Sequence, residues 1–186
     1  MKRIILLSFV SMLLSVGTTM AEGISSAREL VAFATAANAG EDITPWADRE
    51  GVISLTADID MAKVKDFVPI AVFDGIFDGG CHTISNWKTT AGLFHIVSEK
   101  AVVRNLTIDA SCSMKCTDNG EEEFYAGFIA DVNHGTLEGC INRGQISHRS
   151  GKSLMSNYVG GICGMNKYIV INCDNYGNVS SSGNFG

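Results

Sequence analysis

The feature that most constrains this chain is an internal repeat near its end. Residues 158–180 align without a gap on residues 125–147, 33 positions earlier, and eight of the 23 aligned pairs are identical. These pairs are Tyr125/Tyr158, Gly127/Gly160, Ile129/Ile162, Asn133/Asn166, Cys140/Cys173, Asn142/Asn175, Gly144/Gly177 and Ser147/Ser180. A unit this short cannot bury an apolar face alone, so a fixed period predicts units that stack on one another.

The type of unit follows from its apolar runs, which are short and separated by Gly and Asn. In the first copy they cover residues 126–130, 136–141 and 145–147, and none is long enough for an ordinary helix. Three strands per copy, each lying on its equivalent in the next, predict an all-β parallel solenoid. The Asn-x-Gly segments at 142–144 and 175–177 predict corners with positive φ and a ladder of Asn side chains.

The first 21 residues have the pattern of a signal peptide. Lys2 and Arg3 precede an apolar run over residues 4–16, and Thr19-Met20-Ala21 supplies a cleavage site. We therefore expect a secreted or cell-surface protein without a transmembrane segment after cleavage, because this run is too short to span a bilayer. Cleavage would remove two of 14 basic residues and none of 20 acidic ones, which changes the net charge from −6 to −8. That balance argues against a nucleic-acid partner.

Residues 22–186 are expected to form one β-helix domain that begins with a helix. Ser26 and Glu29 form a capping box, and Gly40 is suited to a left-handed cap, which predicts a helix over about 26–39. This helix would cover the first rung of a stack that runs over about 51–186 and begins with a strand at 52–55.

The last two residues, Phe185 and Gly186, match the start of both earlier copies. Val159-Gly160 and Ala126-Gly127 occupy the equivalent positions. We therefore expect further repeats or domains beyond residue 186, so that the sequence is a fragment of a longer protein. The alternative is that another chain covers the open end, because uncapped strand edges favour strand addition.

Several segments resemble a known family. They are LTADIDM at 55–61, FVPIAVFDGIFDGGCHTISNW at 67–87, AGLF at 91–94, YVGGICG at 158–164 and NCDNYGNVS at 172–180. They are similar to the secreted GLUG-motif proteins, bacterial surface proteins that are common in gut Bacteroidetes and whose repeats also occur beside IgA-protease-like peptidases. The resemblance implies a right-handed parallel β-helix, export, and usually no catalytic site within the repeats. Cys81 departs from the pattern, since the family commonly has glycine there.

Six cysteines in an exported chain permit disulfides. The first candidate pair is Cys112 with Cys116, in what is predicted to be a polar loop. Cys140 and Cys173 fall at equivalent repeat positions, about 4.8 Å apart, but stacked side chains point the same way. We expect these two to be buried free thiols ahead of a disulfide.

Acidic residues near turns are candidates for binding calcium. Asp58, Asp60, Asp74 and Asp78 are interpreted first as acceptors for turn amides, because no complete calcium-loop spacing is present. The acidic loop at 118–123 is interpreted as a solvated insertion, with weak cation binding as the alternative. No cofactor or metal is therefore expected.

No catalytic motif is evident. The four histidines, His82, His95, His134 and His148, do not assemble in the sequence, and neither HExxH nor GxSxG occurs. The aligned copies also fail to stack acids into a groove, as the pairs Asp131/Gly164, Glu138/Ile171 and Asp174/Ile141 show. We therefore expect no enzyme activity within the repeats.

Binding is the better prospect, and five residues are candidate ligand contacts. Arg143 aligns with Tyr176, which favours a cation–π contact between adjacent rungs. Tyr168 adds aromatic surface, as do Trp46 and Trp87, while His148 and Arg149, with Lys152, form a small basic loop. The alternative is that the aromatic residues pack under loops and the basic loop is merely solvated.

The prediction is a non-catalytic secreted or cell-surface module for adhesion or for binding a glycan or a protein. One alternative is an accessory segment of a larger secreted peptidase, which a downstream HExxH domain would support. Another is a carbohydrate-active β-helix enzyme, which three or more charged side chains converging in a cleft along one sheet would favour. Fold alone cannot choose among them.

Overall fold

The chain folds as a parallel β-helix. The computed structural model describes residues 23–118, 123–150 and 156–182. The predicted signal peptide at 1–21 and the predicted start of another copy at Phe185–Gly186 lie outside the described residues. In the described part, the strands form five sheets in which every strand pairs with its neighbours in parallel.

Each sheet contains at most one short strand from each turn of the coil. Sheet 1 consists of β1 (Val52–Ser54), β4 (Ile76–Asp78), β8 (Val102–Arg104), β13 (Thr136–Glu138) and β18 (Ile169–Ile171). Sheet 2 consists of β2 (Ile59–Asp60), β5 (Thr83–Ser85), β9 (Thr107–Ile108), β14 (Ile141–Asn142) and β19 (Asp174–Asn175). Sheet 3 consists of β6 (Lys88–Thr89), β10 (Ser113–Thr117), β15 (Gln145–Arg149) and β20 (Val179–Ser182).

The remaining two sheets complete the coil. Sheet 4 consists of β3 (Ile70–Phe73), β7 (Phe94–Val97), β12 (Ala130–Asn133) and β17 (Cys163–Asn166), and sheet 5 pairs β11 (Glu123–Gly127) with β16 (Ser156–Gly160). One copy of the repeat therefore holds five short strands, and the prediction of three was wrong. Two of the predicted apolar runs span corners, at residues 128–129 and 139–140, that divide them into separate pieces.

The register confirms the 33-residue repeat and shows that earlier turns have other lengths. Tyr125 pairs with Tyr158 and Asn142 with Asn175, as aligned. In sheet 1, however, Ile53 pairs with Phe77, 24 positions later, whereas Val103 pairs with Leu137, 34 positions later. The longer turns contain the extra strands of sheet 5.

The core fills the inside of the coil with stacked apolar side chains. Phe73, Phe77 and Phe94 are buried and pack ring against ring, with centroids 5.0 to 6.3 Å apart. Within sheet 1, the inward ladder continues through Val103 and Leu137, each fully buried. Val170 follows on the last described rung and is 39% exposed.

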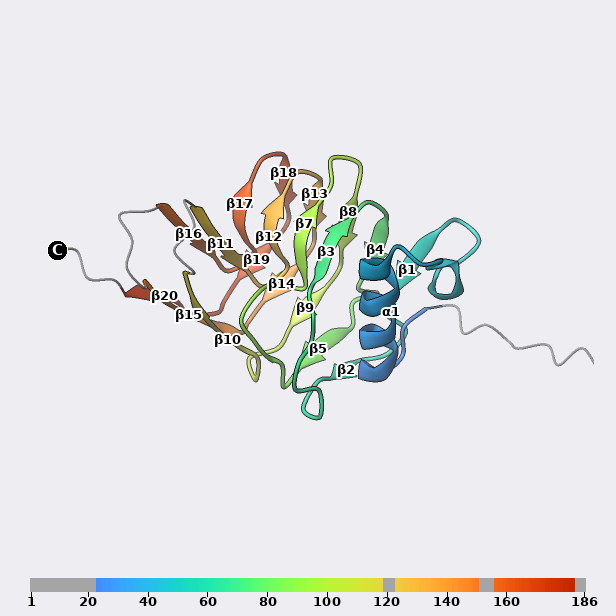
Figure 1. Ribbon diagram of the computed structural model, residues 1–186, viewed down its shortest axis with the longest axis horizontal. Coiled ribbons are helices and arrows are strands. Elements are labelled where there is room, and N and C mark those ends of the chain that lie inside the picture. Colours follow the sequence, from blue (N-terminus) through green and yellow to red (C-terminus); the bar gives the residue numbers. More distant parts are fainter. Residues whose placement is uncertain (1–22, 119–122, 151–155, 183–186) are drawn as a thin grey trace, which may run out of the picture.

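The predicted N-terminal helix is present and covers the first rungs. Helix α1 (Ala27–Ala39) is preceded by the N-cap Ser26, whose hydroxyl accepts from the Glu29 amide, and ends at Gly40 with φ 67°. The Glu29 carboxylate reaches back past the N-cap and accepts from both the amide and the hydroxyl of Ser25. A 3₁₀ turn, η1 (Thr44–Trp46), follows. Figure 1 shows α1 at one end of the stack and β17 to β20 at the other.

The Asn ladders are confirmed, but the positive φ angles lie elsewhere. The Asn142 amide donates to the Asn175 side chain at 2.8 Å, and Asn133 donates to Asn166 at the same distance. Positive φ occurs instead after strands of sheet 1, for example at Gly139 (60°), and after β5 of sheet 2 at Asn86 (54°). Gly144 is needed for close approach, since a Cβ there would lie 2.9 Å from the ring of Phe128.

Cys81 lies in the corner that follows β4 of sheet 1 and has an unusual backbone conformation. Cys81 has φ 60° directly after Gly80, at a position where glycine would be unstrained. The equivalent corners use Asn105 and Asn172, and asparagine tolerates this conformation better than most residues.

The predicted Cys112–Cys116 disulfide was wrong. All six cysteines are free thiols. Cys116 lies within strand β10 and Cys112 directly before it, so an extended backbone of about 3.3 Å per residue keeps them too far apart for a bridge. Cys140 is buried and Cys173 is half-buried, with the Cys173 sulfur accepting from the Cys140 amide at 3.4 Å. Free thiols at these two positions agree with the prediction.

Candidate functional site

The predicted pairing of Arg143 with Tyr176 is confirmed. The guanidinium carbon lies 5.0 Å from the centre of the phenol ring, and the tyrosine is 65% exposed. Both residues lie in the corner that follows sheet 2, on adjacent rungs. This contact is available to a ligand but forms a single point on a convex corner.

The other predicted contacts are scattered. Tyr168 is 61% exposed and lies between β17 and β18, beside a cavity of about 320 Å³. Arg149 is exposed at the end of β15. The assignment of His148 to a surface loop was wrong, because it alternates inward on β15 and is buried. Its ring stacks on Phe124 with centroids 5.1 Å apart, and its Nδ1 lies 2.9 Å from the Ser181 hydroxyl.

The two tryptophans do not add exposed aromatic surface for a ligand. Trp87 is buried against Phe67 and Phe128, and Trp46 is partly buried against Phe33 in α1. Lys152 lies outside the described residues. The five predicted contacts therefore do not form one site.

Among the aspartates interpreted as acceptors for turn amides, Asp60 and Asp78 are confirmed in that role, and Asp58 accepts from an amide of the next rung. Asp58 accepts from the Thr83 amide at 2.9 Å, Asp60 from the Ala62 amide at 3.0 Å, and Asp78 from the Gly80 amide at 2.8 Å. Asp118, at the start of the acidic loop, is buried, and residues 119–122 lie outside the described residues. Among the residues that the structure describes, no group of three His, Cys, Asp or Glu side chains could hold a metal ion.

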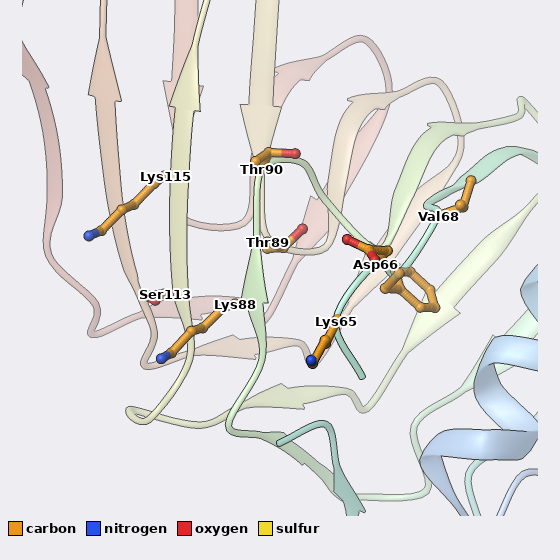
Figure 2. A pocket seen from close by; sticks show the side chains of 9 residues that line it. Lys65, Asp66, Val68, Lys88, Thr89, Thr90, Ser113 and Lys115 are labelled. Carbon is orange, nitrogen blue, oxygen red and sulfur yellow. The ribbon is translucent and has the colours of Figure 1, made fainter. Parts of the chain in front are cut away.

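A pocket that the sequence analysis did not identify lies beside sheet 3. Its volume is about 480 Å³, and three lysines, three hydroxyl side chains, one acid and two apolar residues line it. We call it the lysine pocket. Its lining residues are Lys65, Asp66, Phe67, Val68, Lys88, Thr89, Thr90, Ser113 and Lys115. Figure 2 shows Lys88 and Lys115 extending in the same direction, with Lys65 and Asp66 on the opposite wall.

Strand pairing positions the charged wall of this pocket. Lys88 on β6 pairs with Ser113 on β10, so these side chains lie side by side on the outer face. Lys115 follows Ser113 by two residues and therefore projects from the same face, since strand side chains alternate. The intervening Met114 is fully buried. The second wall comes from residues 65–68, which precede β3.

The electrostatics of the lysine pocket are those of an anion site. None of its lysines forms an ion pair with any side chain in the described part of the chain, and Asp66 is the single acid in its lining. Thr90 and Ser113 add hydroxyl groups to the lining, whereas the Thr89 hydroxyl bonds to the backbone of Ala91. A concentration of three cations in a chain of net charge −6 attracts a negatively charged ligand.

A second cleft adjoins the lysine pocket at Thr90, which lines both. It has a volume of about 260 Å³ and contains His95 and Asp131, with Glu123 and Tyr125 on its rim. The His95 Nδ1 lies 2.5 Å from Asp131, which is buried and also accepts from the amides of Gly92 and Gly127. This hydrogen bond raises the pKa of His95. The Tyr125 hydroxyl donates to Glu123, which raises the pKa of that phenol to about 12.

The expectation that the histidines do not assemble was therefore wrong for His95. Phe94 pairs with Ala130 and Ile96 with Val132, which places His95 opposite Asp131, 36 positions later. The repeat gave no signal for this pair, because its period is 33 and the inserted β11 lengthens this turn. The pairing of Lys88 with Ser113 was concealed because that turn is shorter than the repeat, with 25 positions between the partners.

Comparisons with known proteins add one structural neighbour. No protein-family model and no curated protein matches the chain, so membership of the GLUG-motif family stays a prediction. Among solved structures, the chain is similar to a protein from Bacteroides ovatus described as a "putative immunoglobulin A1 protease", with 18% identity and a TM-score of 0.40. The alignment covers 70% of this chain and 61% of that one. The parallel β-helix itself is defined by the strand pairing above.

Within residues 23–118, 123–150 and 156–182, no helix is long and apolar enough to cross a membrane.

Proposed function

We propose that the chain is a non-catalytic, exported β-helix module that binds an acidic glycan in the lysine pocket. The observation that carries the proposal is that Lys65, Lys88 and Lys115 line one pocket without ion-pair partners in the described part of the chain. Carboxylate or sulfate groups would complete these pairs.

The rest of the lining suits a sugar better than a small inorganic anion. Thr90 and Ser113 can exchange hydrogen bonds with sugar hydroxyls. Val68, which is 65% exposed, can cover the C–H face of a pyranose ring. A volume of about 480 Å³ lies within the usual range of ligand pockets, roughly 300–1,000 Å³.

Titration calorimetry with a sulfated disaccharide, and with the unsulfated disaccharide of the same backbone, tests this proposal. We expect the sulfated sugar to bind more tightly, and Lys88→Ala or Lys115→Ala to weaken its binding by about two- to tenfold each, as an exposed charged contact does. Lys167→Ala, at an exposed lysine in a different corner, is the matched control. Equal binding of both sugars, or equal losses in all three variants, would contradict the proposal.

The adjoining His95–Asp131 pair favours a second candidate, a carbohydrate-active β-helix enzyme. A buried carboxylate orients the imidazole and leaves Nε2 as a candidate acid or base beside the lysine pocket. Incubation with acidic polysaccharides, followed by assay of new reducing ends, separates the two: turnover that His95→Gln abolishes supports the enzyme, and binding without turnover supports the module.

Export and a place in a larger peptidase remain proposals that the sequence motivates. Export depends on the pattern at residues 1–21. Cell fractionation of the native host, with detection of the mature N-terminus at Glu22, tests it. The complete reading frame tests the alternative role as an accessory segment of a secreted peptidase.

A further inference from the structure

Building on the proposed function, we infer that the ligand is a linear acidic polysaccharide that lies obliquely across the outer face of sheet 3, from Lys88 past Lys115 to Arg149. This inference extends the site beyond the lysine pocket and assigns Arg149, which lies outside that pocket, to the same binding surface.

The strand register places the three cations in one oblique row. Lys88 pairs with Ser113 at the start of β10, and Lys115 lies two residues further along the same strand. Arg149 pairs with Thr117, two residues further again, but on the next strand, β15. Each step across one strand, about 4.8 Å, is thus accompanied by a step of two residues, about 6.7 Å, along the strand direction. Successive cations are therefore anchored about 8 Å apart.

Alternation of side chains puts this row on the outside of the coil. The inward positions Met114, Cys116, Ile146 and His148 are all buried, whereas Lys115 and Arg149 are exposed. The outward positions of β10, β15 and β20 around the row are otherwise uncharged and carry hydroxyl or amide groups. They are Ser113, Thr117, Gln145, Ser147, Ser180 and Ser182.

The chemistry of this face favours a polysaccharide over other polyanions. A row of separated cations among hydroxyl and amide groups fits a chain that carries an acidic group at intervals and sugar hydroxyls between them. Single-stranded nucleic acid would need aromatic side chains for base stacking, and the outward positions of these strands carry none. A folded protein partner would be expected to use aromatic anchors in apolar surroundings, whereas the outward positions of β10, β15 and β20 around the row are polar.

The test is the dependence of affinity on ligand length, measured by calorimetry with sulfated oligosaccharides from the disaccharide upward. We expect affinity to increase with length in the native chain and to reach a plateau once the ligand spans Lys88 to Arg149. Arg149→Ala should reduce the affinity of the longest ligand about two- to fivefold, as an exposed ion pair does, and should weaken disaccharide binding less. Arg149→Lys should restore most of that loss.

Arg28→Ala, at an exposed arginine of α1 on the far end of the stack, is the matched control. If the affinity of Arg149→Ala still increases with ligand length as in the native chain, the oblique row is wrong, and the proposal for the lysine pocket is unaffected. If Lys88→Ala leaves even the disaccharide unaffected, the proposed function itself is wrong. Equally tight and equally Arg149-dependent binding of single-stranded DNA would overturn the assignment to a polysaccharide.

Discussion

At the scale of single residues, amide side chains stabilise the turns by bonding along the stack. Asn142 is fully buried, donates to Asn175 and to the Gly144 carbonyl at 3.1 Å, and accepts from the Gly144 amide at 2.9 Å. Every polar atom of its side chain is thus used inside the coil. Its equivalent, Asn175, makes the same local bond to Gly177 but is exposed.

Asn142→Asp should therefore destabilise the fold, because the carboxylate keeps the acceptor but loses both donated hydrogen bonds in a buried site. We expect a loss of about 2 kcal/mol in unfolding free energy at neutral pH. Burial raises the pKa of the new carboxyl, so the protonated form is favoured in the folded state and the loss should increase as pH rises through that pKa. Urea unfolding at several pH values measures this. Asn175→Asp, at the exposed end of the ladder, should cost clearly less, and equal losses would contradict the explanation.

His95 should give the fold a measurable dependence on pH. Because the bond to Asp131 raises the folded pKa of His95, its stabilising contribution is complete below the unfolded pKa, about 6.5, and is lost as pH rises through the folded value. Wild-type stability should therefore fall over this window, and His95→Gln should flatten the profile. Urea midpoints and NMR titration of the His95 ring provide the check. An unchanged profile in His95→Gln would assign the pH dependence to other groups.

At the scale of elements, the N-terminal helix covers the core and supplies hydrogen-bond partners to the backbone of the edge strand β3. Phe33 of α1 packs against Phe73 and Phe77, with centroids 6.4 and 6.2 Å apart. The Asn38 side chain takes the place of a neighbouring strand's backbone at the edge of β3. Its amide donates to the Pro69 carbonyl at 2.9 Å, and its oxygen accepts from the Ala71 amide at 2.8 Å. Such protection prevents pairing of that edge with another chain.

Asn38→Ala should free this edge and cost about 1 kcal/mol, the net value of the lost hydrogen bonds at a partly exposed site. We also expect faster aggregation on warming, because β3 then presents unpaired backbone groups. Thermal unfolding followed by light scattering measures both effects. Thr35→Ala, whose hydroxyl bonds only to the Val31 carbonyl within α1, is the matched control and should change stability by less than about 0.5 kcal/mol. Similar aggregation in the two variants would argue against the role of Asn38.

At the scale of the whole molecule, stability comes from one continuous stack and not from covalent cross-links. Cys112, Cys116 and Cys140 are buried within the coil, where burial raises the pKa of Cys116 to about 11. Cys81 is exposed at its corner. Outward positions of sheet 3 also carry Lys88, Lys115 and Arg149, which gives this acidic chain one positively charged face.

Thiol accessibility tests this arrangement. Iodoacetamide treatment of the native protein should label Cys81 first, and Cys112, Cys116 and Cys140 should react at least about tenfold more slowly, because the reactive thiolate is rare and shielded in the core. Peptide mapping by mass spectrometry identifies the labelled sites. A reducing agent should leave the unfolding temperature unchanged. A drop in that temperature, or a mass consistent with a bridge between Cys112 and Cys116, would show that the chain is cross-linked.

The sequence by itself determined the architecture of the stack. Fixed spacing of Asn142 and Asn175, and of Tyr125 and Tyr158, sets the register of the last two turns, because identical residues in a parallel solenoid lie above one another. The capping signals around Ser26 and Gly40 are local and were sufficient to place α1.

Only the tertiary structure decided where the charged side chains meet. Lys88 reaches Ser113, and His95 reaches Asp131, across turns whose lengths differ, so no fixed period relates these residues. Strand alternation also turned His148 inward and left its neighbour Arg149 outside, because a shift of one residue exchanges the two faces of a strand. Of the five predicted contacts, Arg149 alone therefore lies on the proposed polysaccharide surface.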